Sequence, residues 1–516
     1  MIRLRGRKPM TGGTGMKRNT DRNRRINLLL CLAVFAAMSV FFIVLHPIPI
    51  MDEDDVIYTV LSRKAIPIPG AWNPSRMMPE LLSSLCGNLA GLCAALHLGR
   101  FIDCQIAVLG LMLSALITAY VFSLKRLLEA RFRLGQFSSV CLALLFLLLH
   151  FLIFRSAYSR NLYLFHTYDQ CCVFFYTMPA LLCCSLVLHF MADPDKEPQL
   201  TGCRPLRESM LVLLLYLAVF SNLFGSAILA AYALFRAVRG FCGRRAGADG
   251  KSLLKTEAVW LAVVILWLLA AVLEATGGRA GGAADAALLS RLGEAYAEWM
   301  KLLGKTALLF RLLVLAAVLA ALGLLAAEKN SGNRKNGLSF LGGVLVWAVP
   351  NALFLLLLSA VVNPKYAGRP EAMFTLLFSV ILLMLLSFAA FVRRWPKASL
   401  LLPVLLLFVY SMTNTRFLTF ADSNPLELDG HLAAAVENEI YEGIIAAARA
   451  GETEITIDVP VSGEEGNWPH DGNIGKPMAA FFLKYGLIDH EILVHTHPSE
   501  DFNRAFNIPL PGEAPA

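Results

Sequence analysis

Long apolar segments recur along this chain, and short polar connections separate them. Eleven segments of about 14–24 residues approach the ~20 residues that a helix needs to cross a bilayer. The pattern predicts an all-α polytopic membrane protein with about eleven transmembrane helices. The expected spans are 26–48, 103–123, 137–154, 171–191, 209–222, 223–238, 256–275, 306–327, 338–361, 372–391 and 397–412.

Composition agrees with a membrane protein. Of 516 residues, 57% are hydrophobic and 16% are charged, and the mean hydropathy is +0.60. A soluble protein carries roughly 25% charged residues. The first apolar segment is longer than the ~7–15 apolar residues of a signal peptide, and no small-x-small cleavage site follows it. It is therefore expected to be a retained span.

Basic residues concentrate in alternate connections. The basic stretches are 1–25, 125–133, 196–207, 236–255, 329–335 and 393–397. Cytoplasmic loops are enriched in Lys and Arg, so this alternation predicts a cytoplasmic N-terminus and an extracytoplasmic tail at 413–516. A basic stretch at 1–25 could also bind nucleic acid, but a span follows it at once, which favours a cytoplasmic anchor on anionic lipid.

Two segments fit the span pattern less simply. Residues 80–98 are apolar enough to span, but counting them would move the basic stretch 125–133 outside. They are therefore expected to form an interfacial helix within the outer loop 49–102. The short segments 209–222 and 223–238 meet at Ser221-Asn222, which predicts a break between two helices.

The tail 413–516 has a different pattern and predicts a small extracytoplasmic α/β domain. Helical spacing marks Asp429–Ala450 and Lys476–Tyr485. Strand patterns mark Thr453–Val459 and Glu491–His495.

Four consecutive acids, Asp52 to Asp55, directly follow the first span. Oxygens from Asp52, Asp54 and Asp55 suit Mg²⁺ or Mn²⁺, which prefer hard ligands. Crowded carboxylates can also raise one another's pKa, which favours a general base. A solvated loop after a span is the structural alternative.

Three cations on the outer side run against the inside bias of positive charge. Arg76 precedes the interfacial helix, and Lys365 and Arg369 lie in a short loop between two spans. These residues favour a phosphate or pyrophosphate site. Headgroup contact or helix capping is the alternative.

The outer loop 155–170 mixes aromatic and polar side chains. Its residues include Tyr158, Tyr163, His166, Tyr168 and Asp169. Such surfaces bind sugars, because a sugar ring has apolar faces and polar edges. An aromatic belt at the membrane interface has the same composition.

Other motifs carry less chemistry. The 11 cysteines lie mostly in apolar stretches, as small buried residues do, and do not suggest a disulfide framework. His495 and His497 share a strand face, but two histidines without further ligands are more typical of a structural role than of a metal site. The chain has no P-loop, dinucleotide-binding or serine-hydrolase motif.

The first span, the acidic motif directly after it and the long outer loop with an interfacial helix resemble the type-C fold (GT-C) of membrane glycosyltransferases. Among these, the chain looks closest to bacterial glucosyltransferase-like proteins with a short extracytoplasmic tail. The similarity covers residues 26–412. Three segments of this chain resemble sequence blocks of such proteins: Trp72 to Arg76, His166 to Pro179 and Pro364 to Pro370.

The resemblance implies a hexosyltransferase of the bacterial plasma membrane. Its donor would be a sugar on a polyprenyl phosphate, and its acceptor a cell-envelope glycan or lipid at the outer face. Asp54 or Asp55 would be the catalytic base, and Asp52 and Asp54 would hold Mg²⁺ or Mn²⁺ in a metal-dependent member. The expected substrate-binding residues are Arg76, His166, Tyr168, Lys365, Tyr366 and Arg369.

Two other functions share this layout. A transporter or flippase of a lipid-linked glycan should hold polar groups near mid-membrane and show repeated halves. The spans here are nearly free of charge and no repeat is visible, which favours the enzyme. A glycan polymerase would also use arginines in outer loops.

Overall fold

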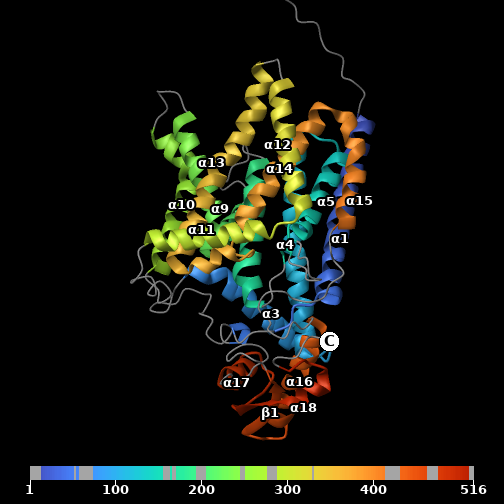
Figure 1. The fold of residues 1–516 in the computed structure, drawn as a ribbon, viewed down its shortest axis with the longest axis vertical. Coiled ribbons are helices and arrows are strands. Elements are labelled where there is room, and N and C mark those ends of the chain that lie inside the picture. The colour runs from blue at the N-terminus through green and yellow to red at the C-terminus, as the bar shows by residue number, and fades with distance from the viewer. Residues whose placement is uncertain are drawn as a thin grey trace, which may run out of the picture.

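A computed structural model of the protein describes most of the chain. The described residues are 13–50, 54–56, 74–154, 163–165, 170–192, 205–243, 250–275, 288–327, 331–412, 430–461 and 475–510. They form a helical bundle with a small C-terminal unit docked on one end (Figure 1). We call this end of the bundle the tail end and the opposite end the far end.

Within the described residues, eight helical segments are long and apolar enough to cross a membrane. They comprise α1 (Gly13–Val40) with the π-helical turn η1 (Phe41–Leu45), α4 (Phe101–Phe132), α6 (Gln170–Cys172) continued by the π-helical turn η3 (Val173–Thr177) and α7 (Met178–Ala192), α9 (Leu223–Gly243), α10 (Gly250–Ala275), α12 (Leu308–Ala327), α13 (Ser331–Val362) and α14 (Phe374–Arg394). The prediction of a multi-pass, all-α membrane protein is confirmed.

Three further expected spans correspond to shorter helices. These are α5 (Gln136–Leu152), α8 (Pro205–Val219) and α15 (Leu402–Met412), the last preceded by the 3-10 turn η7 (Pro396–Leu401). The count of eleven spans therefore stays a prediction. The break expected at Ser221-Asn222 is confirmed, and Asn222 Oδ1 accepts a hydrogen bond from the Phe224 N–H at 2.8 Å, as a helix-capping side chain does.

The spans run alternately toward and away from the tail. The start of α4 lies at the tail end, whereas Arg131 near its end donates from Nε to the carbonyl of Met191 at the end of α7, 2.7 Å away. The 32 residues of α4 extend about 48 Å at 1.5 Å per residue. The basic stretches 125–133 and 393–397 thus lie at the far end of the bundle (Figure 1).

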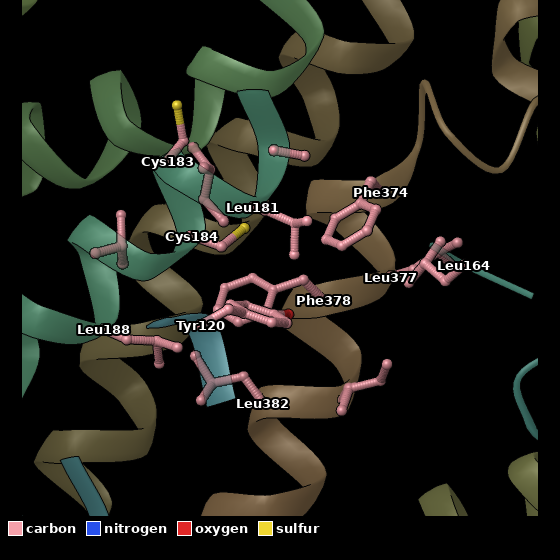
Figure 2. Close-up of a cluster of buried hydrophobic side chains, with 14 of the residues drawn as sticks. Tyr120, Leu164, Leu181, Cys183, Cys184, Leu188, Phe374, Leu377, Phe378 and Leu382 are labelled. Atoms are coloured by element: carbon pink, nitrogen blue, oxygen red, sulfur yellow. The ribbon is translucent and has the colours of Figure 1, made fainter. Parts of the chain in front are cut away.

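A buried polar pair, Tyr120 and His150, lies among apolar side chains in the bundle core. Tyr120 of α4 packs against Phe378 of α14 and neighbours Cys184 of α7 (Figure 2). His150 Nδ1 lies 2.7 Å from the carbonyl of Phe146 and donates to it, which leaves His150 Nε2 to accept from the Tyr120 hydroxyl at 3.1 Å. Both side chains are satisfied, and their hydrogen bond links α4 to α5.

The tail forms the small α/β unit that its pattern predicts. It contains α16 (Gly430–Arg449), β1 (Glu454–Pro460), α17 (Gly475–Lys484), β2 (Leu493–Ser499) and a short α18 (Glu500–Phe506). The two strands are parallel, with Glu454 opposite Leu493 and Pro460 opposite Ser499. Parallel neighbours need a crossover connection, and the segment that includes α17 provides it.

The expected interfacial helix, α3 (Met77–Ala95), has two apolar faces. One face packs on the tail: a Cβ added at Gly91 would lie 2.6 Å from the backbone oxygen of Tyr485, so only glycine allows this approach. The other face exposes leucines at helical spacing. They are Leu81, Leu85, Leu89, Leu92 and Leu96.

The connection between the expected spans 256–275 and 306–327 contains a helix. This helix, α11 (Leu288–Gly304), lies across the bundle (Figure 1). Polar residues interrupt the apolar residues of α11, so it has no apolar run long enough to predict a span. Its apolar residues nevertheless recur at helical spacing, as in an amphipathic helix. Arg291 of α11 donates from Nε to the carbonyl of Ala360 at 2.6 Å and thereby caps α13.

Candidate functional site

The segment Gln170–Thr177 is the hub of the tail end. Gln170 Nε2 donates to the carbonyl of Ile48 at 2.8 Å, and Gln170 Oε1 accepts from Gln105 Nε2 at 2.8 Å. These bonds fix the start of one span to the end of the first. Residues Val173–Thr177 form a π-helical turn, and such turns are frequent at functional sites.

The hub holds the acidic motif through Asp55. The backbone N–H of Cys171 donates to Asp55 Oδ1 at 2.6 Å, and Asp55 is only 5% exposed. The preceding Asp54 is exposed, and the following Val56 is fully buried. Asp55 and Val56 thus anchor the short helical turn, and the turn presents Asp54 to solvent.

The hub also holds Arg369. Its Nη2 donates to Cys172 Sγ at 3.0 Å, its Nε bonds to Glu371, and its guanidinium lies over the rings of Tyr176 and Tyr366. Burial alone would lower the pKa of Arg369, but the nearby Glu371 carboxylate raises it above its ordinary value. The guanidinium therefore stays charged.

Arg76 reaches the same hub from the other side. It lies over the ring of Phe175, and its Nε and Nη2 donate to the two oxygens of Glu274 at 3.1 and 3.0 Å. Burial lowers the pKa of Arg76, and the bonds to Glu274 more than offset this. Within the described residues, Nη1 of Arg76 and Nη1 of Arg369 make no hydrogen bond, so each arginine keeps a donor for a ligand.

The loop between α13 and α14 presents two further predicted residues. Its 3-10 turn η6 (Pro364–Gly368) starts at Asn363, whose Oδ1 accepts from the Lys365 N–H at 3.0 Å. Lys365 is exposed, and no ion pair involves its side chain in the described part of the chain. The ring of Tyr366 lies 6.2 Å from that of Tyr176 and 5.5 Å from that of Phe224.

An apolar cavity of about 210 Å³ adjoins these residues. Arg76, Glu274, Asn222 and Tyr366 give it polar groups. The remaining wall is almost entirely apolar and comes from the ends of α9, α10 and α13 and from the hub, with Leu223, Phe224, Ala271, Phe354, Leu357, Leu358, Val361, Val362 and Phe175 among its residues.

The tail contributes to the surroundings of the acidic motif. Tyr441 of α16 is fully buried, which raises the pKa of its hydroxyl, and the charges of Glu437 and Asp55 raise it further. Burial lowers the pKa of Lys484 of α17, against the opposite effect of Glu80. Helices α16 and α17 therefore face residues that follow the first span, including Asp55 and Glu80.

The structure brings together most of the predicted site residues. Asp55, Arg76, Tyr366 and Arg369 all border the hub or residues in contact with it, and Asp54 is next to Asp55. The predicted residues Asp52, His166 and Tyr168 lie outside the described residues. Tyr163 is buried against Phe41 and Phe151, so it belongs to the aromatic core.

The described residues do not assemble a metal site. No three His, Cys, Asp or Glu side chains among them are grouped to hold a metal ion. His495 pairs with Glu454 at 2.8 Å and His497 with Asp458 at 2.9 Å, two separate contacts across the strands. A metal held by Asp52 and Asp54 stays a prediction.

Sequence patterns did not single out several residues of the site. These are Gln170, Cys172, Tyr176, Glu274 and Glu371. Glu274 had a detectable signal, because it is a carboxylate at the end of an apolar span and ionisable groups there are usually functional. Gln170, Cys172 and Tyr176 lie in the block His166 to Pro179, but no pattern distinguishes them from their neighbours there.

Two sequence comparisons with known proteins found no relative. No protein-family model matches the chain, and no curated protein is similar to it in sequence.

Proposed function

We propose that this protein transfers a hexose from a polyprenyl-phosphate carrier to a cell-envelope glycan or lipid. The observation that carries the proposal is the hub Gln170–Thr177. It links a carboxylate motif, two charged arginines and an apolar cavity at one end of a membrane bundle. A base, cations for a phosphate and a groove for a lipid chain are the three parts that this reaction needs.

The cavity fits the carrier. Its apolar wall suits the first units of an isoprenyl chain, and Arg76 and Tyr366 suit the phosphate at the head of that chain. Leu357 in this wall is 41% exposed, which supports entry from the lipid side. The spare Nη1 donors of Arg76 and Arg369 and the exposed Lys365 would bind the phosphate oxygens.

The two described acids, Asp54 and Asp55, would have different roles in the reaction. Asp54 is exposed, so it can reach an acceptor hydroxyl and take its proton as that oxygen bonds to the anomeric carbon of the sugar. The bond from the anomeric carbon to the phosphate oxygen breaks, and polyprenyl phosphate leaves with its charge held by the cations. Asp55 is a positioning residue, because it is buried and bonded to the Cys171 N–H.

We further propose that the tail end faces outward from a bacterial plasma membrane. The far end carries the basic stretches 125–133 and 393–397, and Lys and Arg are enriched on the cytoplasmic side. With this orientation the acids, the arginines and the tail all lie outside. We also propose eleven spans in a GT-C-like arrangement, and this odd number would put the N-terminus and the tail on opposite sides of the membrane.

A transfer assay with the purified full-length protein tests the proposal. The probes are short-chain polyprenyl-phosphate hexoses, and product formation is measured for the wild type, Asp54→Asn, Asp55→Asn and the double variant. Asp54→Asn should lose about 10²- to 10⁴-fold in turnover, the usual contribution of a general base. The exposed Asp501→Asn in the tail is the matched control and should retain full turnover.

Two outcomes would contradict the proposal. One is full turnover in all three acid variants. The other is a wild-type protein that forms no product from any hexose donor but moves a lipid-linked glycan across liposome membranes, which would make it a transporter.

A further inference from the structure

A second cavity lies between the bundle and the tail. It measures about 320 Å³ and is separate from the cavity beside Arg76. Its wall combines the end of the first span, the start of α4 and the first turns of α16. The residues of the wall are Ile43, Pro47, Arg100, Asp103, Ile106, His431, Ala434, Ala435 and Asn438.

The polar side chains of this cavity form a short hydrogen-bonded network, and atoms at both ends of the network make no hydrogen bond within the described residues. Arg100 Nε donates to Asp103 Oδ2 at 3.0 Å, and Asn438 Nδ2 donates to Asp103 Oδ1 at 2.9 Å. Within the described residues, Arg100 Nη1, Arg100 Nη2 and Asn438 Oδ1 make no hydrogen bond. Asn438 is only 2% exposed, so its side chain is fixed at the cavity rather than in solvent.

The cavity lies at the depth where the apolar part of the first span ends. That span runs over Asp21–Leu45, and Ile43 is in its last turn. Its neighbours Val44 and Leu45 are 55% and 48% exposed, as lipid-facing residues are. Lipid headgroups occupy this level, where the hydrocarbon core gives way to water.

We propose that this cavity binds a zwitterionic phospholipid headgroup with a primary amine, as in phosphatidylethanolamine. The phosphate would accept hydrogen bonds from the terminal nitrogens of Arg100, next to the N-terminal turn of α16, which favours a phosphate. The ammonium group would donate to Asp103 and to Asn438 Oδ1. Arg100 and Asp103 form an ion pair without net charge, so a headgroup that carries both charges keeps the site neutral.

Such a lipid would join the tail to the membrane. Its headgroup would contact α4 and α16 together, and its glycerol and first methylenes would cover Ile43 and Ile106. The inference does not depend on glycosyl transfer. It depends on the spans, the docked tail and the polar groups of the cavity.

A binding titration of the purified full-length protein in a neutral detergent tests the inference. The probes are dihexanoyl-phosphatidylethanolamine, the matching phosphatidylcholine and phosphatidylglycerol, soluble phosphoethanolamine, and inorganic phosphate. We expect saturable binding of the ethanolamine lipid at one site, at least tenfold tighter than any other probe. Phosphatidylcholine lacks the N–H donors, and the soluble probes lack the apolar contacts.

Variants assign the binding to this cavity. Arg100→Ala and Asp103→Asn should each weaken binding of the ethanolamine lipid at least tenfold. Arg504→Ala is the matched control, because Arg504 is also exposed and pairs with acids three and four residues away. Equal binding of phosphatidylglycerol or inorganic phosphate would overturn the proposal, as would unchanged binding in Arg100→Ala and Asp103→Asn.

Discussion

The two cavities at the tail end each contain an arginine and a carboxylate but hold them differently. Arg76 binds both oxygens of Glu274, and the two side chains are 16% and 23% exposed. Arg100 binds Asp103 through Nε alone, and these side chains are 55% and 45% exposed. Burial makes the first pair a fixed part of its wall, because either charge alone would be costly there. Solvent leaves the second pair weak and open to exchange with a ligand.

The cavities also differ in what builds their walls. The wall beside Arg76 comes entirely from the bundle, between Ser75 and Tyr366. The wall beside Arg100 needs α16 of the tail. The two proposed functions can therefore be tested separately. A change that moves the tail should affect the second cavity and spare the first.

Filling the first cavity should have the largest effect. Ala271→Trp puts an indole into about 210 Å³ of space, so the carrier chain should lose its groove. We expect at least a tenfold rise in KM for a polyprenyl-phosphate hexose in the transfer assay, in line with the ~1–3 kcal/mol of overpacking and lost contact. Leu268→Trp, on the exposed side of the same helix, is the control and should keep the wild-type KM. Equal KM values in the two variants would contradict this role of the cavity.

Loosening the tail should have an intermediate effect, confined to the second cavity. A Cβ at Gly430 would lie 2.2 Å from the backbone oxygen of Pro47, so Gly430→Ala must shift the start of α16. We expect a loss of about 1–3 kcal/mol in tail stability, measured by thermal unfolding, together with weaker binding of the ethanolamine lipid. Gly293→Ala is matched because no atom lies within 4 Å of its added Cβ. If the Gly430→Ala and Gly293→Ala proteins bind the ethanolamine lipid equally and unfold at the same temperature, the close packing of Gly430 against Pro47 would be contradicted.

The smallest expected effect is on the pH dependence of the stability of the tail. The pKa of His490 is raised above 6.5, mainly by its hydrogen bond to the Glu452 carbonyl and next by its hydrogen bond to Asp489. The hydrogen bond with His490 in turn lowers the pKa of Asp489 below 3.8. The contribution of His490 to the stability of the folded tail is complete below pH 6.5 and is lost as the pH rises through the pKa of His490 in the folded protein. That of Asp489 is complete above pH 3.8 and is lost as pH falls through its folded pKa.

His490→Gln should therefore lower the tail's melting temperature slightly between about pH 4 and 6.5 and have less effect at pH 8. Melting curves of both proteins at pH 5.5 and 8 measure the difference. A uniform shift at both pH values would show that the ionised pair does not cause it.

Much of the architecture was predictable because its signals are local. Apolar length marked the spans, the polar pair Ser221-Asn222 marked the break before α9, and the periodicity of 429–450 marked α16. The acids Asp54 and Asp55 and the cations Arg76, Lys365 and Arg369 stood out as charges in an apolar chain. Helix α11 was missed because its mixed composition resembles that of a loop when only span length is considered.

The partners of those charges could not be predicted. Arg76 and Glu274 are 198 residues apart, and Arg369 and Cys172 are 197 apart. The need for glycine at Gly91 and Gly430 comes from Tyr485 and Pro47, which approach only when the tail docks. Such contacts depend on how whole helices pack, and no local spacing encodes them.

The residue pattern alone predicts a multi-pass helical protein, the approximate positions of its spans, a small α/β tail and the residue types available at one end. Hydrophobic burial and backbone hydrogen bonding act on short stretches, so their pattern is visible in the chain. Contacts between distant helices bury Asp55 and expose Asp54, join the acids to the arginines through the π-helical hub, and let the tail complete a second cavity. These features arise where helices distant in sequence meet, and packing alone selects which side chains share the space.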